Sequence, residues 1–217
     1  MEAIIFDMDG VLIYSTKYIW ESFNELLKKY NIHFTDKEIR RYLGMSMRDK
    51  LNLWKKEYNL PENIDPIEFS NKAFEIELKL IKKELQPNKE ILKLIGSAKK
   101  QNIKIAVATS STKGRAEKIL ELLQIKDKLD SLITAEDVEK HKPNPQIFLK
   151  AAEELKVNPK ECVVFEDAVN GILAAKNAGM KSIALLTEIT SKRDFEDIAD
   201  LIITDFSEVD LEILEKL

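Results

Sequence analysis

Two aspartates stand close together near the start of the chain, in the stretch IIFDMDGVLI at residues 4–13. Asp7 and Asp9 directly follow a short apolar run and are separated by one residue, so in an extended chain their side chains point to the same side. Paired carboxylates serve acid–base chemistry or bind hard cations. A single aspartate after a strand is more often a turn or cap residue, but two adjacent charges that repel each other indicate a functional site.

Polar tracts also follow later apolar runs of the chain. They are Thr109, Ser110 and Ser111 after the run at 103–108, Lys142 before Pro143, and Glu166 and Asp167 after the run at 162–165. Each tract by itself is more often a helix cap or a solvated side chain. Because ligands bind at the carboxyl ends of parallel strands, the recurrence of such tracts at successive strand ends predicts one shared site.

The elements that must position these residues are short apolar runs rich in β-branched residues. We predict strands at 3–6, 103–108, 162–165, 181–186 and 201–204. Their lack of polar alternation is typical of strands covered on both faces of a parallel sheet. Helical patterns lie between the later runs, so the sequence predicts an α/β fold with a doubly wound parallel sheet.

Residues 16–85 contain no strand-like run and carry helical patterns instead. We therefore expect an all-helical insert at 15–86, between two parts of an α/β core at 1–14 and 87–217, with hinges near residues 14 and 86. Thr35 and Glu38 resemble a capping box that opens one of the helices. Trp20 and Trp54 are interpreted as core residues of the insert rather than as a platform for ligand stacking.

Composition excludes several classes of protein. The chain has 217 residues and a net charge of −4, with Lys and Arg scattered, so no nucleic-acid partner is expected. No apolar run approaches the roughly 18 residues of a membrane helix, and no membrane partner is expected. The N-terminal residues lack the pattern of a signal peptide, and the single cysteine, Cys162, excludes an internal disulfide. These features predict a cytoplasmic protein.

Four motifs together resemble the haloacid dehalogenase superfamily of phosphatases and phosphomutases. They are DMDGV at 7–11, ATSS at 108–111, KPNP at 142–145 and FEDAVNGILAAKNAGM at 165–180. The resemblance covers the whole chain, including a helical cap inserted after the first motif. It is nearest to the branch that contains β-phosphoglucomutase and phosphoglycolate phosphatase. It implies a Rossmann-like core with an inserted helical cap.

The resemblance also implies catalytic roles. Asp7 would be the nucleophile that forms an aspartyl-phosphate. Asp9 would protonate the leaving oxygen and then activate water. The implied cofactor is Mg²⁺, held by the carboxylates of Asp7 and Asp167 and the main-chain carbonyl of Asp9. Glu166 would support the metal or the neighbouring lysine, and a direct ligand role stays open.

The remaining core motifs would bind phosphate. The Thr109 hydroxyl, the Ser110 amide and the Lys142 ammonium would each contact a phosphate oxygen, which offsets the repulsion between a carboxylate and a phosphoryl group.

Substrate specificity is expected in the segment GMSMRD at 44–49, which matches the specificity loop of this branch. The residues expected to face the leaving group are Gly44, Met45, Ser46 and Arg48. The chain departs from the mutase at two positions, because Ile19 replaces a histidine and Met47 replaces a phosphate-binding arginine. Tyr14 stands where the branch commonly has an acidic residue.

The leading hypothesis is a Mg²⁺-dependent phosphatase acting on a small phosphorylated metabolite, such as a sugar phosphate or phosphoglycolate. The alternatives are a phosphomutase of the β-phosphoglucomutase type and a non-catalytic protein that binds such metabolites. A phosphonatase would need an imine-forming cap lysine, and none of Lys50, Lys55 and Lys56 has a distinctive context. Whether the protein is a monomer or a dimer is left open.

Overall fold

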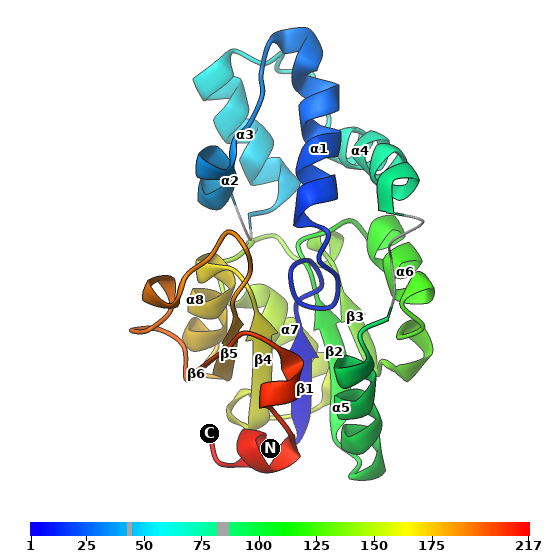
Figure 1. Cartoon of the computed structure of the whole chain (residues 1–217), viewed down its shortest axis with the longest axis vertical. Helices are drawn as coiled ribbons and strands as arrows, with labels where there is room; N and C mark the ends of the chain where they lie inside the picture. The colour runs from blue at the N-terminus through cyan, green and yellow to red at the C-terminus, as the bar shows by residue number, and fades with distance from the viewer. Residues whose placement is uncertain (43–44, 82–86) are drawn as a thin grey trace.

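The structure of the chain, a computed structural model, describes residues 1–42, 45–81 and 87–217, apart from the side chains of Asp36 and Arg40. Its strands form one parallel sheet in the order β3-β2-β1-β4-β5-β6 (Figure 1). The strands are β1 Ala3–Phe6, β2 Lys104–Ala108, β3 Ser131–Ile133, β4 Cys162–Glu166, β5 Lys181–Leu185 and β6 Leu201–Ile203. The strand order reverses between β1 and β4, which is where ligands bind in sheets of this kind.

Both faces of the sheet are covered by helices. Ile4 and Phe6 pack on one face, whereas Ala3 and Ile5 pack on the other, because successive strand residues point to opposite sides. The first face is covered by α5 Lys89–Lys100, α6 Lys113–Leu122 and α9 Leu211–Glu215. The second is covered by α7 Gln146–Leu155 and α8 Val169–Asn177. This three-layer arrangement explains why the strands read as continuous apolar runs.

All five predicted strands are present, with ends that differ by no more than a residue. The prediction missed β3, which has three residues and lies at the edge of the sheet next to β2. A run this short does not stand out from the helical patterns around it. The chain also contains 3₁₀ helices at Lys28–Tyr30, Lys126–Lys128, Ala135–Asp137, Pro159–Glu161, Lys192–Asp194 and Phe206–Glu208.

The insert is helical over the described residues and lies beyond the carboxyl ends of the strands, at the top of Figure 1. Its helices are α1 Thr16–Leu27, α2 Asp36–Tyr42, α3 Met47–Tyr58 and α4 Pro66–Ile81. The predicted α/β core with an all-helical cap is therefore confirmed. The boundary near residue 86 borders the segment 82–86, outside the described residues, so the domain limits stay a prediction.

An aromatic cluster fills the cap. Trp54 is fully buried, and its ring lies 4.8 Å from Phe34 and 6.1 Å from Trp20, measured between ring centroids. The interpretation of both tryptophans as core residues holds for Trp54, whereas Trp20 also lines a cavity described below. At the start of α2, the Glu38 carboxylate accepts a hydrogen bond from the Thr35 N–H at 2.9 Å, as expected for a capping box.

Within the described part of the chain, no helix combines the length and the apolar character that crossing a membrane requires.

We expect Trp54→Ala to destabilise the cap, because it removes the largest fully buried side chain from the aromatic cluster. Large-to-small substitutions of this kind cost about 3–5 kcal/mol. Urea unfolding followed by circular dichroism measures the loss. Leu149→Ala on the surface of α7 is the control, and it should change the unfolding free energy by less than about 1 kcal/mol. Equal losses in the two variants would contradict the proposed role of the cluster.

Candidate active site

The central strands bring the predicted core residues to one edge of the sheet. Phe6 of β1 pairs with Val107 of β2 and Phe165 of β4, so Asp7 follows in register with the ends of both neighbouring strands. The Asp7 N–H donates to the Phe165 carbonyl at 2.9 Å. Thr109 comes directly after β2, where its hydroxyl accepts a hydrogen bond from the Ser111 N–H at 3.1 Å. The prediction of a shared site at the strand ends agrees with this placement.

Lys142 lies at the centre of the buried part of the site. Its ammonium donates to Asp7 Oδ1 at 2.5 Å, to Glu166 Oε1 at 2.6 Å and to the Ala108 carbonyl at 3.3 Å. Lys142 itself does not end a strand, since β3 stops at Ile133 and a loop carries the lysine back to the site. The ammonium therefore compensates two carboxylates that come from neighbouring strands.

Glu166 is buried, and its two oxygens have different partners. Oε1 accepts the hydrogen bond from Lys142, whereas Oε2 accepts hydrogen bonds from the N–H groups of Asp167 and Ala168, each at 2.8 Å. These contacts fix the lysine and the start of the segment that leads into α8. The predicted support of Lys142 by Glu166 agrees with this geometry.

Two glycines leave space for carboxylates of the site. A Cβ at Gly10 would stand 1.9 Å from Asp167 Oδ2, and Gly10 has a φ of +85°, which side chains rarely allow. A Cβ at Gly171 would stand 1.8 Å from Glu166 Oε1. The sequence suggested a turn for Gly10 and helix packing for Gly171. The structure adds that each backbone lies directly against a site carboxylate.

Negative charge accumulates at this edge of the sheet. Burial raises the pKa of the Asp7 carboxyl to about 7, against the opposing effect of the Lys142 ammonium. Burial also raises the pKa of Asp167 well above its usual range, and the neighbouring Glu166 and Asp7 carboxylates raise it further. Such a group of carboxylates suits a hard divalent cation, because its donors are oxygens alone.

The predicted Mg²⁺ ligands fit this chemistry. The set consists of two carboxylates, from Asp7 and Asp167, and the main-chain carbonyl of Asp9. Over residues 1–42, 45–81 and 87–217, no group of three or more His, Cys, Asp or Glu side chains is arranged to hold one ion.

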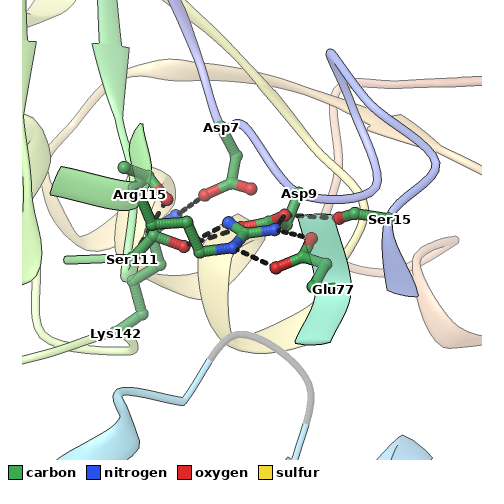
Figure 2. A network of polar contacts seen from close by, with 8 residues as sticks. Asp7, Asp9, Ser15, Glu77, Ser111, Arg115 and Lys142 are labelled. Carbon is green, nitrogen blue, oxygen red and sulfur yellow. Dashed lines mark hydrogen bonds and ion pairs between the residues drawn. The ribbon is translucent and has the colours of Figure 1, made fainter. Parts of the chain in front are cut away.

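The Asp9 carboxylate is directed toward α6 (Figure 2). Its Oδ1 accepts hydrogen bonds from the Ser15 hydroxyl and from Arg115 Nη2, the latter at 2.7 Å. Its Oδ2 accepts from the Ser111 hydroxyl at 2.8 Å and from Arg115 Nη1 at 2.7 Å. Burial alone would raise the pKa of this carboxyl, but Arg115 and the two hydroxyls hold it below its usual value. In this arrangement Asp9 is ionised and both of its oxygens are occupied.

Arg115 and Glu77 were not predicted from the sequence. Arg115 binds both Asp9 and Glu77. The side chains of Arg115 and Glu77 are buried. One signal could have identified Glu77, because it interrupts the apolar stripe of Phe69, Ala73 and Ile81 at four-residue spacing on α4. A carboxylate on such a stripe requires a buried partner.

A cavity of about 170 Å³ lies between the strand ends and the cap. From the core it is lined by the predicted residues Asp7, Asp9, Thr109, Ser110, Glu166 and Asp167. Buried Lys142 lies behind Asp7 and Glu166. Further core residues, among them Ser111, Arg115 and His141, and residues of the cap supply the other walls, so the cavity lies between both parts of the molecule.

The predicted specificity residues meet this cavity where the structure describes them. Met45, Ser46 and Arg48 line it, whereas Gly44 lies outside the described residues. Ser46 has a structural task as well, because its hydroxyl accepts a hydrogen bond from the Asp49 N–H at 3.1 Å and caps α3.

Lys50 is a further cavity residue that the sequence did not single out. It lies on α3, and its ammonium is 5.5 Å from the Trp20 ring and 5.8 Å from the Phe23 ring. Its backbone N–H donates to the Ser46 carbonyl, but among the described residues its ammonium makes no hydrogen bond or ion pair. Burial lowers the pKa of Lys50 to about 8, although the Asp9 carboxylate opposes this effect. The cap thus presents to the cavity an ammonium that has no ion-pair partner in the part of the chain that the structure describes.

Comparison with known proteins gives consistent matches along the chain. A family model described as haloacid dehalogenase-like hydrolase matches residues 4–185. A phosphorylated carbohydrates phosphatase of Thermotoga maritima is 31% identical over 183 residues, which cover 84% of each chain. The β-phosphoglucomutase of Bacillus subtilis is 31% identical over 100% of this chain and 95% of its own.

A solved structure gives the same result. CbbY from Rhodobacter sphaeroides, in complex with phosphate, aligns with a TM-score of 0.88 and 26% identity over 99% of both chains. These findings confirm the predicted fold and the predicted enzyme class, a hydrolase that acts on phosphate esters. The chain belongs to the haloacid dehalogenase-like hydrolases.

Proposed function

We propose that the chain is a Mg²⁺-dependent phosphatase that hydrolyses a small phosphorylated metabolite, such as a sugar phosphate, through an aspartyl-phosphate at Asp7. The observation that carries this proposal is the ammonium of Lys142 held between Asp7 and Glu166, beside a cavity enclosed by the cap. The relative named as a phosphorylated carbohydrates phosphatase supports the substrate class.

The residues divide the chemistry as follows. The Asp7 carboxylate attacks phosphorus, while Lys142 holds Asp7 in place and stabilises the added negative charge. The Thr109 hydroxyl and the Ser110 amide donate to oxygens of the phosphoryl group. Asp9 gives a proton to the leaving oxygen and later takes one from the attacking water.

Mg²⁺ is the cofactor that this site requires. Asp7, Asp167 and the Asp9 main-chain carbonyl would hold it, and it would offset the charge of the carboxylates and the phosphate.

The cap encloses the reaction. With a cap at 15–86 and hinges near residues 14 and 86, closure would exclude bulk water from the aspartyl-phosphate until hydrolysis. A small phosphorylated metabolite in the cytoplasm is the partner that this design suits.

A phosphomutase is the second candidate. The full-length match to the β-phosphoglucomutase of Bacillus subtilis favours it. Ile19 and Met47 line the cavity and supply neither the histidine nor the arginine expected of that mutase, and this favours hydrolysis.

The deciding experiment measures phosphate release from a panel of phosphorylated metabolites, first with Mg²⁺ and then with EDTA. The panel contains hexose and pentose phosphates, glycerol phosphates, phosphoglycolate, nucleotides and β-glucose 1-phosphate. Mg²⁺-dependent release supports the phosphatase. Conversion of β-glucose 1-phosphate to the 6-phosphate without release supports the mutase. If folded protein gives neither of these results, the outcome supports a non-catalytic binding protein.

Replacing the nucleophile should abolish turnover without unfolding the protein. The amide of Asp7→Asn neither attacks phosphorus nor carries the charge that pairs with Lys142, so we expect less than about 1% of wild-type kcat. The exposed substitution Asp127→Asn is the control and should leave kcat unchanged. Activity above a few per cent in Asp7→Asn would show that another group attacks phosphorus.

Gly171→Ala should reduce kcat by about tenfold or more, because the added methyl takes the place of the Glu166 carboxylate that supports Lys142. Alanine favours a helix over glycine by about 1 kcal/mol, so destabilisation of α8 would not be the cause. Gly114→Ala in α6 is the matched control, since a Cβ there meets no atom within 4 Å. Equal kcat values for the two variants would refute the proposal that Glu166 supports Lys142 in catalysis.

Lys50 is expected to bind the leaving-group part of the substrate. Its pKa is lowered to about 8, so the ammonium is present below pH 8 and is lost as the pH rises above that value. We expect KM of the wild type to increase above pH 8. Lys50→Met should raise KM by about tenfold at pH 7 and remove this pH dependence, unlike the exposed control Lys56→Met. An unchanged KM in Lys50→Met would exclude contact with substrate.

A further inference from the structure

A cluster of three charged side chains, two buried and the third partly exposed, connects the cap to the core. Glu77 of α4 and Arg115 of α6 are 2% and 6% exposed. Glu77 Oε2 accepts from Arg115 Nε at 2.7 Å, and Oε1 accepts from Nη2 at 2.6 Å. The adjacent edge of the guanidinium, formed by Nη1 and Nη2, binds Asp9 (Figure 2). One cation therefore lies between a carboxylate of the cap and a carboxylate of the active site.

The guanidinium is held rigidly in this place. It has five N–H donors in a planar fork. Two donate to Glu77, two to Asp9, and one to the Ser111 hydroxyl at 2.8 Å. With every donor used, Arg115 cannot shift without losing hydrogen bonds to at least one carboxylate. A buried charge that loses its partner is strongly unfavourable, so the three side chains move as a unit.

Asp9 depends on this unit for its orientation. Arg115 supplies two of the four hydrogen bonds that its carboxylate accepts, and Ser15 and Ser111 supply the others. The carboxylate is thereby directed toward α6, with both oxygens occupied. Asp9 also lines the cavity, so this unit sets where its carboxylate stands relative to a leaving group.

We propose that Arg115 is a positioning residue for Asp9 and that Glu77 makes this positioning depend on the cap. Movement of α4 relative to α6 displaces Glu77, the guanidinium follows its buried partner, and the Asp9 carboxylate, which accepts two hydrogen bonds from that guanidinium, turns with it. Cap position and orientation of the acid–base group are then one coupled equilibrium. The inference rests on the proposed phosphatase function, in which Asp9 protonates the leaving oxygen.

The test compares two substrates by kcat/KM, which reports the steps up to departure of the leaving group. p-Nitrophenyl phosphate has a leaving group that needs no proton, whereas the best sugar phosphate of the panel releases an alkoxide that does. Arg115→Met should lower kcat/KM for the sugar phosphate at least tenfold relative to the aryl phosphate, because general acid catalysis contributes about 10²–10⁴-fold. Unfolded protein would lower both values equally.

Glu77→Gln is the decisive variant, because it keeps the side-chain shape and removes the charge that binds Arg115. We expect it to lower the sugar-to-aryl ratio at least threefold in the wild-type background and to have no effect in Arg115→Met. If Glu77 acted on substrate directly from the cavity wall, its effect would persist without Arg115, and the inference would be wrong. If Arg115→Met does not fold, Arg115→Lys serves as the background, since it keeps a cation but loses the fork.

Glu57→Gln is the matched control. It breaks a cap ion pair with Arg41 that contacts neither the core nor Asp9, so the ratio should stay unchanged. An unchanged ratio in Glu77→Gln, with active wild type, overturns the inference and leaves the phosphatase proposal intact. A wild type that turns over neither substrate instead contradicts the proposed function itself.

Discussion

The structure depends on one electrostatic constraint, which is the concentration of buried carboxylates at the carboxyl edge of the sheet. Asp7, Glu166 and Asp167 come from two neighbouring strands and lie within a small, poorly hydrated space. At about 4 Å and an effective dielectric constant near 20, two like unit charges repel by roughly 4 kcal/mol. Such a group is stable only with cations between its members, and Lys142 contacts two of these carboxylates directly.

The backbone around this edge is shaped by the same constraint. Gly10 and Gly171 lie against Asp167 and Glu166, so the carboxylates occupy space that side chains would otherwise fill. The Glu166 carboxylate also accepts two main-chain N–H groups, which ties the charge balance to the start of α8. Catalytic geometry and local folding are therefore set by the same contacts at these positions.

The cap adds a second layer of charge balance. It contributes Glu77, which shares Arg115 with Asp9, and Lys50, whose ammonium faces the cavity without a partner among the described residues. The first contact pairs charges of the protein with one another, whereas the second leaves a positive charge for a ligand. A helical insert with an aromatic core is rigid enough to hold both side chains over the strand ends.

The sequence by itself determined the fold class and the core of the site. Short continuous apolar runs rich in β-branched residues are typical of strands buried on both faces of a sheet, and parallel strands bring Asp7, Thr109 and Glu166 to one edge. The polar tracts also included Lys142 and Asp167, to which the motif resemblance added roles, and the structure brings both residues to the same place. The short edge strand β3 was missed, because three residues carry too little pattern.

Only the tertiary structure decided how the cap meets the core. Glu77 and Arg115 are far apart in sequence, and nothing local to either residue specifies the other as its partner. Lys50 looked like any other helix lysine, and its distinctive surroundings arise from the packing of α3 above the strand ends. Periodicity in a sequence reports which face of an element is buried. The docking of the cap on the core decides which charges face each other. That information is spread over the whole chain.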